Sequence, residues 1–187
     1  MLKKIALTLL AVVSLAVVAI LVLASTRPAT YHVERSISTN AAPQAVFDVI
    51  NDFHRFAEWS PWQKLDPAMK VTFDGPPIGV GSSLAWKGNR DAGAGRMTIT
   101  EEAPPGSLTQ KLEFLEPWKS TCSVRFDLAA EGEGSRITWN MDGDLDFMSK
   151  VMSVFASMDQ MIGKDFEAGL ASLKQVAEAA RAPSATP

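Results

Sequence analysis

The sequence predicts an α+β domain in which a curved antiparallel sheet wraps around one long C-terminal helix, with two short helices after the first strand. Two observations predict this arrangement. Apolar residues recur at every second position between residues 69 and 144, which is typical of strands with one buried face. From Phe147 to Ala180 they recur at every third and fourth position, which is typical of an amphipathic helix. Because the sheet face and the helix stripe each need a cover, we expect them to pack together.

The first 26 residues form a separate apolar segment. Nineteen residues from Ile5 to Leu23 carry no charge, and as a helix they would span about 28 Å, close to the hydrocarbon thickness of a bilayer. Lys3 and Lys4 precede the run, and flanking cations tend to stay in the cytoplasm. We therefore expect a single-pass membrane anchor with a cytoplasmic N-terminus, and a domain exported to the periplasmic or extracellular side.

Two other interpretations of this segment stay open. Small residues around Ala24 would suit a signal peptidase, although the run is longer than the usual core of a cleaved signal. The segment could also be a buried helix of a soluble protein. With an anchor at residues 1–26, residues 27–30 form a linker, residues 31–180 the domain and residues 181–187 a disordered tail.

The domain begins with one strand and two short helices. Residues 31–38 alternate, with Tyr31, Val33, Arg35 and Ile37 on one face. Residues 43–52 place apolar side chains on one helical face, and a second short helix covers about residues 53–58. It should end before Pro61, because a proline disfavours helical geometry in the residue before it.

Six strand candidates follow and indicate an antiparallel meander, because short turn-like stretches separate them. They read MKVTFDG, SLAWKG, GRMTITEEAP, SLTQKLEFLEP, STCSVRFDLAAE and SRITWNMDGD. Their inward positions are mainly apolar and their outward positions polar. The inward set comprises Met97, Ile99, Leu112, Phe114, Val124, Phe126, Leu128, Ile137, Trp139 and Met141.

Composition narrows the possible partners. The chain has 187 residues and a formal charge of −3, and it has no basic stripe, so we expect no nucleic-acid partner. Cys122 is the only cysteine, so no intramolecular disulfide can form. His32 and His54 are the only histidines, and neither has a ligand at metal-site spacing. We expect no metal and no cofactor; the oligomeric state is left open.

A ligand cavity is expected between sheet and helix, because one helix cannot fill a strongly bent sheet. In the stretch FAEWSPWQKLDP, Trp59 and Trp62 either cap the core or line this cavity. Methionines in the long helix would suit a loosely specified apolar ligand or ordinary core packing. The candidate cavity residues are Trp59, Trp62, Trp86, Met97, Phe114, Phe126, Trp139, Met148, Met152, Phe155 and Asp159.

Asp159 is the polar exception on the apolar stripe of the long helix. A carboxylate that faces the sheet needs a partner or takes a raised pKa. One interpretation is a structural pair with an arginine or hydroxyl on a strand. The other is a functional group that hydrogen-bonds a ligand or acts as a general base.

The order of elements, together with YHVERSISTNAAPQAVFDVINDFHRFAEWSPW, GVGSSLAWKG, GRMTITEEAPPGSLTQKLEF, RITWNMDG and MDQMIGKDFEAGLASLK, resembles the SRPBCC superfamily of START-like, helix-grip proteins. The branch it resembles is labelled polyketide cyclase/dehydrase, and the resemblance covers about residues 31–177. It implies a helix-grip fold with a hydrophobic tunnel. It does not imply one reaction, since such folds include lipid carriers, hormone receptors and aromatic cyclases.

We therefore expect a membrane-tethered binding protein for a hydrophobic or amphipathic small molecule, lipid-like or aromatic. An enzyme of the cyclase or dehydrase type, with Asp159 as its acid or base, is the alternative. A third possibility is a structural or envelope-stress protein whose partner is another protein. Such a protein would show an exposed apolar patch outside the tunnel.

Overall fold

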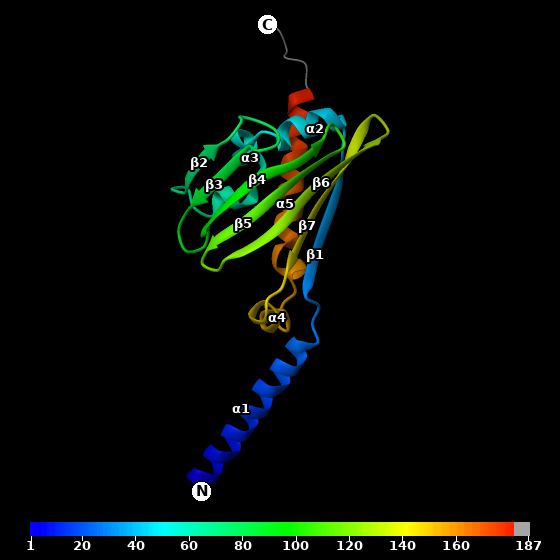
Figure 1. Cartoon of the computed structure of the whole chain (residues 1–187). Helices are drawn as coiled ribbons and strands as arrows, with labels where there is room; N and C mark the ends of the chain where they lie inside the picture. Colours follow the sequence, from blue (N-terminus) through cyan, green and yellow to red (C-terminus); the bar gives the residue numbers. More distant parts are fainter. Residues whose placement is uncertain (182–187) are drawn as a thin grey trace.

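The computed structural model describes residues 1–181 and shows a curved sheet, a long C-terminal helix in its concave side and an N-terminal helix projecting from one end (Figure 1). Residues 182–187 of the predicted tail lie outside the described residues. The strands are β1 (Thr30–Thr39), β2 (Lys70–Asp74), β3 (Ser83–Lys87), β4 (Ala94–Ala103), β5 (Ser107–Glu116), β6 (Ser120–Glu131) and β7 (Gly134–Asp144). The helices are α1 (Leu2–Ser25), α2 (Pro43–Ile50), α3 (Phe56–Trp59), α4 (Phe147–Ser153) and α5 (Met158–Arg181), with 3-10 turns η1 (Phe53–Arg55) and η2 (Pro61–Lys64).

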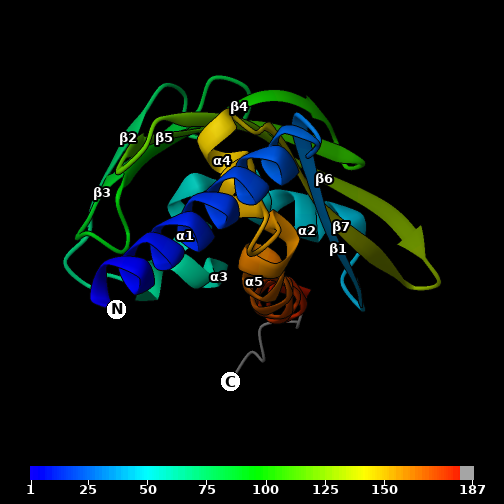
Figure 2. The same ribbon diagram turned by 90° about the horizontal axis from the view of Figure 1, so that it is seen from below.

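The seven strands form one open antiparallel sheet in the order β1-β7-β6-β5-β4-β3-β2. The first strand of the chain pairs with the last, from Thr30 opposite Asp144 to Thr39 opposite Ser135. Seen from below, the sheet arches over α5 and the short helices (Figure 2). The predicted α+β class with a curved sheet around a C-terminal helix is confirmed.

An aromatic cluster joins α5 to the sheet. The Phe166 ring of α5 stacks on Trp139 of β7 with centroids 4.1 Å apart, and Trp139 stacks in turn on Phe126 of β6. Gly169 permits this close approach, because a Cβ atom there would lie 2.7 Å from Cζ3 of Trp139. Trp59 of α3 meets Trp139 edge-on and is itself almost fully buried. The cluster therefore packs α3 and α5 against β6 and β7.

The prediction of one uninterrupted helix from residue 147 to residue 180 is wrong. The structure has α4 and α5 with a break at residues 154–157. Ser157 explains the new start, because its Oγ accepts a hydrogen bond from Gln160 N while the Gln160 side chain accepts one from Ser157 N. This reciprocal pair is a capping box, which marks a helix N-terminus.

Strand direction gives the sheet two distinct ends. At the α1 end, β1 and β6 begin, β5 and β7 end, and the β5–β6 turn at residues 117–119 lies there. At the far end lie the β2–β3 loop at residues 75–82 and the β6–β7 turn at residues 132–133. Figure 1 shows α4 at the α1 end, beside the last turns of α1.

Within α1, residues Lys3–Ser25 form a helix that is long and apolar enough to cross a membrane. Its large apolar side chains are exposed, for example Leu7, Leu15 and Val22. A signal sequence would pass the same test of length and composition.

Candidate ligand cavity

A cavity of about 400 Å³ lies between the concave face of the sheet and the N-terminal half of α5. Its walls are mainly apolar, and the side chains contributed by the strands include Leu84, Trp86, Met97, Leu112 and Met141. Met158 and Ile162 of α5 lie on its other side. The volume falls within the range of small-molecule sites, and the lining matches their usual chemistry.

Gly95 allows one wall of the cavity to form. It pairs with Trp86 of β3 on one side and with Phe114 of β5 on the other. A Cβ atom on Gly95 would collide with the Trp86 ring, so the indole lies over the bare backbone. The Trp86 Nε1–H donates to the Ala92 carbonyl at 3.1 Å, which orients the ring. The rings of Trp86 and Phe114 meet edge-on with centroids 6.1 Å apart.

Trp62 and Ser60 form the wall next to the short helices. Pro61 begins η2, and Trp62 meets the ring of Trp139 edge-on at 5.7 Å. Ser60 is 3% exposed and lines the cavity, yet its Oγ has no hydrogen-bond partner among the described residues. A buried hydroxyl without a partner is costly and would gain from a polar group on a ligand.

The predicted cavity residues fall into three groups. Trp62, Trp86, Met97 and Phe114 line the cavity. The second group consists of core residues in the aromatic cluster, not of cavity-lining ones: Trp59, Phe126 and Trp139. In the stretch FAEWSPWQKLDP, therefore, one tryptophan is in the core and the other faces the cavity.

The third group lies outside the cavity. Met148 and Met152 of α4 and Phe155 after it are 66%, 56% and 71% exposed. The physical reason is the helix break, which removes α4 from the axis of α5 and turns its apolar side chains away from the sheet.

Asp159 also lies outside the cavity and is paired with a strand. Arg35 of β1 donates to both of its carboxylate oxygens, at 2.6 and 3.2 Å, and to Glu167 at 2.9 Å. The hydrogen bonds from Arg35 lower the pKa of Asp159. Gly163 leaves room for this guanidinium, since a Cβ atom there would collide with it. Asp159 therefore forms a structural ion pair with Arg35, which is the first of the two interpretations given above. We do not propose it as a general base in the cavity.

Sequence reasoning missed several lining residues, among them Tyr31, Ser60, Ile162 and Asp165. Tyr31 lies on the inward side of the first strand, and Ile162 lies in the helical stripe, so both could have been named from periodicity. Ser60 carries no such signal, because only the turn between α3 and η2 aims it at the cavity.

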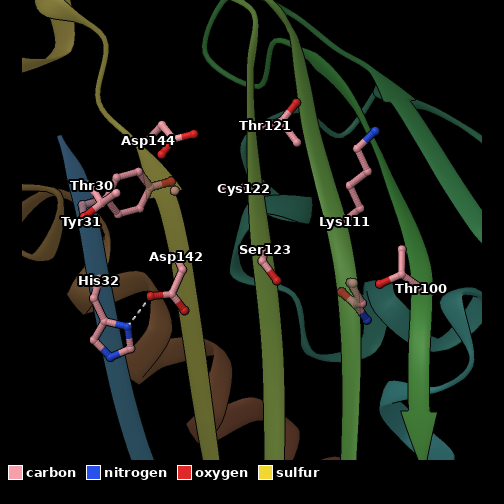
Figure 3. A pocket seen from close by; sticks show the side chains of 12 residues that line it. Thr30, Tyr31, His32, Thr100, Lys111, Thr121, Cys122, Ser123, Asp142 and Asp144 are labelled. Carbon is pink, nitrogen blue, oxygen red and sulfur yellow. Dashed lines mark hydrogen bonds and ion pairs between the residues drawn. The ribbon is translucent and has the colours of Figure 1, made fainter.

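A second hollow of about 740 Å³ lies on the outer face of the sheet. Figure 3 shows the side chains of Lys111, Ser123 and Asp142 facing the reader, with the helices behind the strands. His32 and Asp142 interact there at 2.7 Å, and this hydrogen bond raises the pKa of His32. The hollow is open and most of its lining residues are polar or charged, so it suits an apolar ligand poorly.

Two side chains that line this hollow, the partly buried Tyr31 and the buried Cys122, are not poised to ionise. Burial raises the pKa of both Tyr31 and Cys122, so each stays neutral at neutral pH. Across residues 1–181, no group of three or more His, Cys, Asp or Glu could hold a metal ion.

An open antiparallel sheet, a long C-terminal helix in its concave side and a cavity between them define a helix-grip domain. The chain belongs to the family described as polyketide cyclase / dehydrase and lipid transport, whose model matches residues 30–178. None of the curated proteins compared with the chain matches it.

Solved structures share the fold at low identity. The di-domain ARO/CYC BexL from the BE-7585A biosynthetic pathway is 16% identical with a TM-score of 0.59, over 88% of this chain and 53% of that one. Protein Ms6760 from Mycobacterium smegmatis is 15% identical with a TM-score of 0.56, over 80% and 92%. Major latex-like protein 151 from Panax ginseng is 15% identical with a TM-score of 0.51, over 83% and 100%. At these identities the likeness concerns the fold alone.

Proposed function

We propose that this protein is a membrane-tethered binding protein that holds a hydrophobic or amphipathic small molecule, lipid-like or aromatic, in the cavity between the sheet and α5. The observation that carries the proposal is the cavity of about 400 Å³ with its apolar wall. Removing apolar ligand surface from water would drive binding, at about 25 cal/mol per Å² buried.

A polar end of the ligand has a partner in the cavity. The Ser60 hydroxyl, which has no hydrogen-bond partner among residues 1–181, can donate to or accept from a ligand oxygen. Gln63 and Asp165 also line the cavity and are partly exposed, so they offer further polar contacts. This mixture of apolar walls and a few polar groups supports an amphipathic ligand such as a lipid or a hydroxylated aromatic compound.

The tether would be α1. Its exposed apolar surface and the preceding Lys3 and Lys4 support an uncleaved anchor with a cytoplasmic N-terminus and an exported domain. The mass of the intact protein extracted from native membranes tests this. An uncleaved N-terminus supports the anchor, and a chain that begins near residue 25 would replace it with a cleaved signal.

The binding proposal is tested with the full chain in detergent, titrated with a dansyl-labelled fatty acid while its fluorescence is followed. Val71→Trp adds an indole in the cavity, whereas Val80→Trp makes the same change on an exposed loop at the far end. We expect Val71→Trp to weaken binding at least about tenfold. The added indole would occupy space that the ligand needs, and the apolar contact area that the ligand loses is worth more than about 1.4 kcal/mol. Val80→Trp should bind as the wild type does.

Equal affinity in both variants would contradict the proposed site. In a separate measurement, mass spectrometry of small molecules that copurify with the full chain identifies the natural ligand class. A thermal melt of each variant confirms that the fold is intact before binding is compared.

A further inference from the structure

Large apolar side chains are exposed together at the α1 end of the molecule. They belong to two segments: one is the end of β5 with the β5–β6 turn, and the other is the region of α4. We call them the apolar rim: Leu115, Trp118, Phe147, Met148, Met152 and Phe155. Trp118 is 80% exposed and Phe155 is 71% exposed, which is costly for side chains of this size in water.

The α4 part of the rim is held against the end of α1. α4 contacts α1, and the Leu145 N–H donates to the Ala29 carbonyl at 2.7 Å, which ties the start of this segment to the linker. Asp146 caps α4 by accepting from Ser149 N at 2.7 Å. In Figure 2 the last turns of α1 lie beside α4. If α1 crosses a membrane, α4 must therefore lie at the membrane surface.

The turn part of the rim lies at the same end. Phe114 of β5 pairs with Ser120 of β6, so the turn that carries Trp118 lies at the α1 end of the sheet. The end of β7, from which the chain continues to α4, lies at the same end. Both parts of the rim border the cavity, because Phe114, Ser120 and Thr121, next to the turn, line it, and so do Leu145 and Ser149, next to and in α4. The cavity therefore reaches the α1 end of the sheet, where both exposed apolar segments lie beside it.

We infer that the apolar rim inserts into the interfacial layer of the lipid bilayer that α1 crosses, so that the cavity opens onto lipid and not onto water. This inference rests on the proposed tether. Tryptophan prefers the membrane interface, since its ring is apolar and its N–H polar, and phenylalanine and methionine gain from burial among acyl chains. A lipid-like ligand would then pass between the bilayer and the cavity without crossing water.

Charge does not account for this surface. Lys119 and Lys150 lie in the two segments, but Glu116, Asp144 and Asp146 lie beside them. A mixed set of charges gives little attraction to anionic lipids. Contact with the bilayer should therefore depend on the apolar side chains and change little with salt concentration.

The test uses the full chain in nanodiscs of phosphatidylcholine and phosphatidylglycerol, with a nitroxide attached to one introduced cysteine at a time. Trp118→Cys, Met148→Cys and Met152→Cys report the rim, Val13→Cys reports α1, and Ile78→Cys is a matched exposed apolar control at the far end. The wild-type chain, whose Cys122 is buried, measures background labelling. The readout is the accessibility of each nitroxide to oxygen relative to a water-soluble nickel chelate.

We expect this ratio at the rim to be several-fold higher than at residue 78, and highest at residue 13. A rim ratio equal to that at residue 78, with residue 13 in the bilayer, would overturn the inference while the tether stands. A low ratio at residue 13 as well would overturn both.

A second readout avoids new cysteines in the rim. Lipids with brominated acyl chains quench indole fluorescence on contact, so the wild type should lose more fluorescence than Trp118→Phe in the same nanodiscs. Equal fractional quenching in the two proteins would contradict insertion of Trp118.

Discussion

At the scale of single residues, Gly95 affects the width of the cavity, because it lets the Trp86 ring lie against the backbone. Trp86 lies against the backbone at this position, and the Glu113 carbonyl approaches it from the neighbouring strand. Gly95→Ala should push the indole toward the cavity, lowering the free energy of unfolding by about 1–3 kcal/mol through overpacking and weakening fatty-acid binding. Urea denaturation and the fluorescence titration measure the two effects.

Gly106→Ala is the matched control for this substitution. Gly106 lies in the β4–β5 turn at the far end, and a Cβ atom there would make only an ordinary contact of 3.5 Å with the Ala103 carbonyl. It should change neither quantity by a comparable amount. If Gly95→Ala proved as mild as Gly106→Ala, the account of this wall of the cavity would be wrong.

His32 should make a small, pH-dependent contribution to stability. Its hydrogen bond to Asp142 raises its pKa above the value in the unfolded chain, so folding favours the protonated form. The stabilisation is fully present below about pH 6.5 and is lost as pH rises through the higher folded-state pKa. Because the pair is largely exposed, we expect at most about 1 kcal/mol.

Urea denaturation of His32→Asn and wild type at pH 5.5 and pH 9 measures this contribution. The variant should be less stable than wild type at the lower pH and match it at the higher pH. Asp142→Asn should remove the same increment, and adding His32→Asn to it should change little. A stability loss that is equal at both pH values would contradict a charge-dependent interaction.

At the scale of elements, the capping box at the start of α5 separates that helix from α4. Ser157→Ala removes the hydroxyl that accepts from Gln160 N, so we expect a loss of about 0.5–2 kcal/mol and faster amide hydrogen exchange in the first turn of α5. Ser172→Ala, in the middle of the same helix, should be neutral or slightly stabilising because alanine favours helix. Loss of equal size in both variants would argue against a cap-specific effect.

The break between the helices also separates two roles. α5 contributes Phe166 to the core and Ile162 to the cavity, whereas α4 carries exposed apolar residues. With an uninterrupted helix, α4 would continue along α5 and could not lie beside α1. The interruption is therefore what lets one apolar stripe face the sheet and the next face outward.

At the scale of the whole molecule, α1 and the apolar rim lie at one end of the sheet, beside lining residues of the cavity, and the other end has neither α1 nor the rim. This polarity follows from strand direction, because an antiparallel meander returns every second turn to the same end. The proposed tether and the proposed ligand site therefore lie at the same end. The membrane and binding experiments test these two parts of the account separately.

Many of the strands and helices follow from patterns of neighbouring residues, and these could be predicted from the sequence. Alternation places Val33, Phe126 and Trp139 on the inward face, and their burial agrees with it. Met148 and Met152 show where local reasoning fails. Their spacing is helical, as predicted, but the direction in which a helical face points depends on where the helix begins. The signal that could have corrected this was the Ser157–Gln160 capping pair.

The sequence by itself determined the strands, the short helices after the first strand, the apolar N-terminal segment and the absence of an intramolecular disulfide, since periodicity and composition act within a few residues along the chain. Only the tertiary structure decided that Trp62 faces a cavity while Trp59 fills the core, that Arg35 holds Asp159, and that Ser60 has an unpaired hydroxyl inside. Those outcomes depend on contacts between segments far apart in the chain. No local sequence pattern determines which side chains fill the space between two packed elements and which leave a cavity.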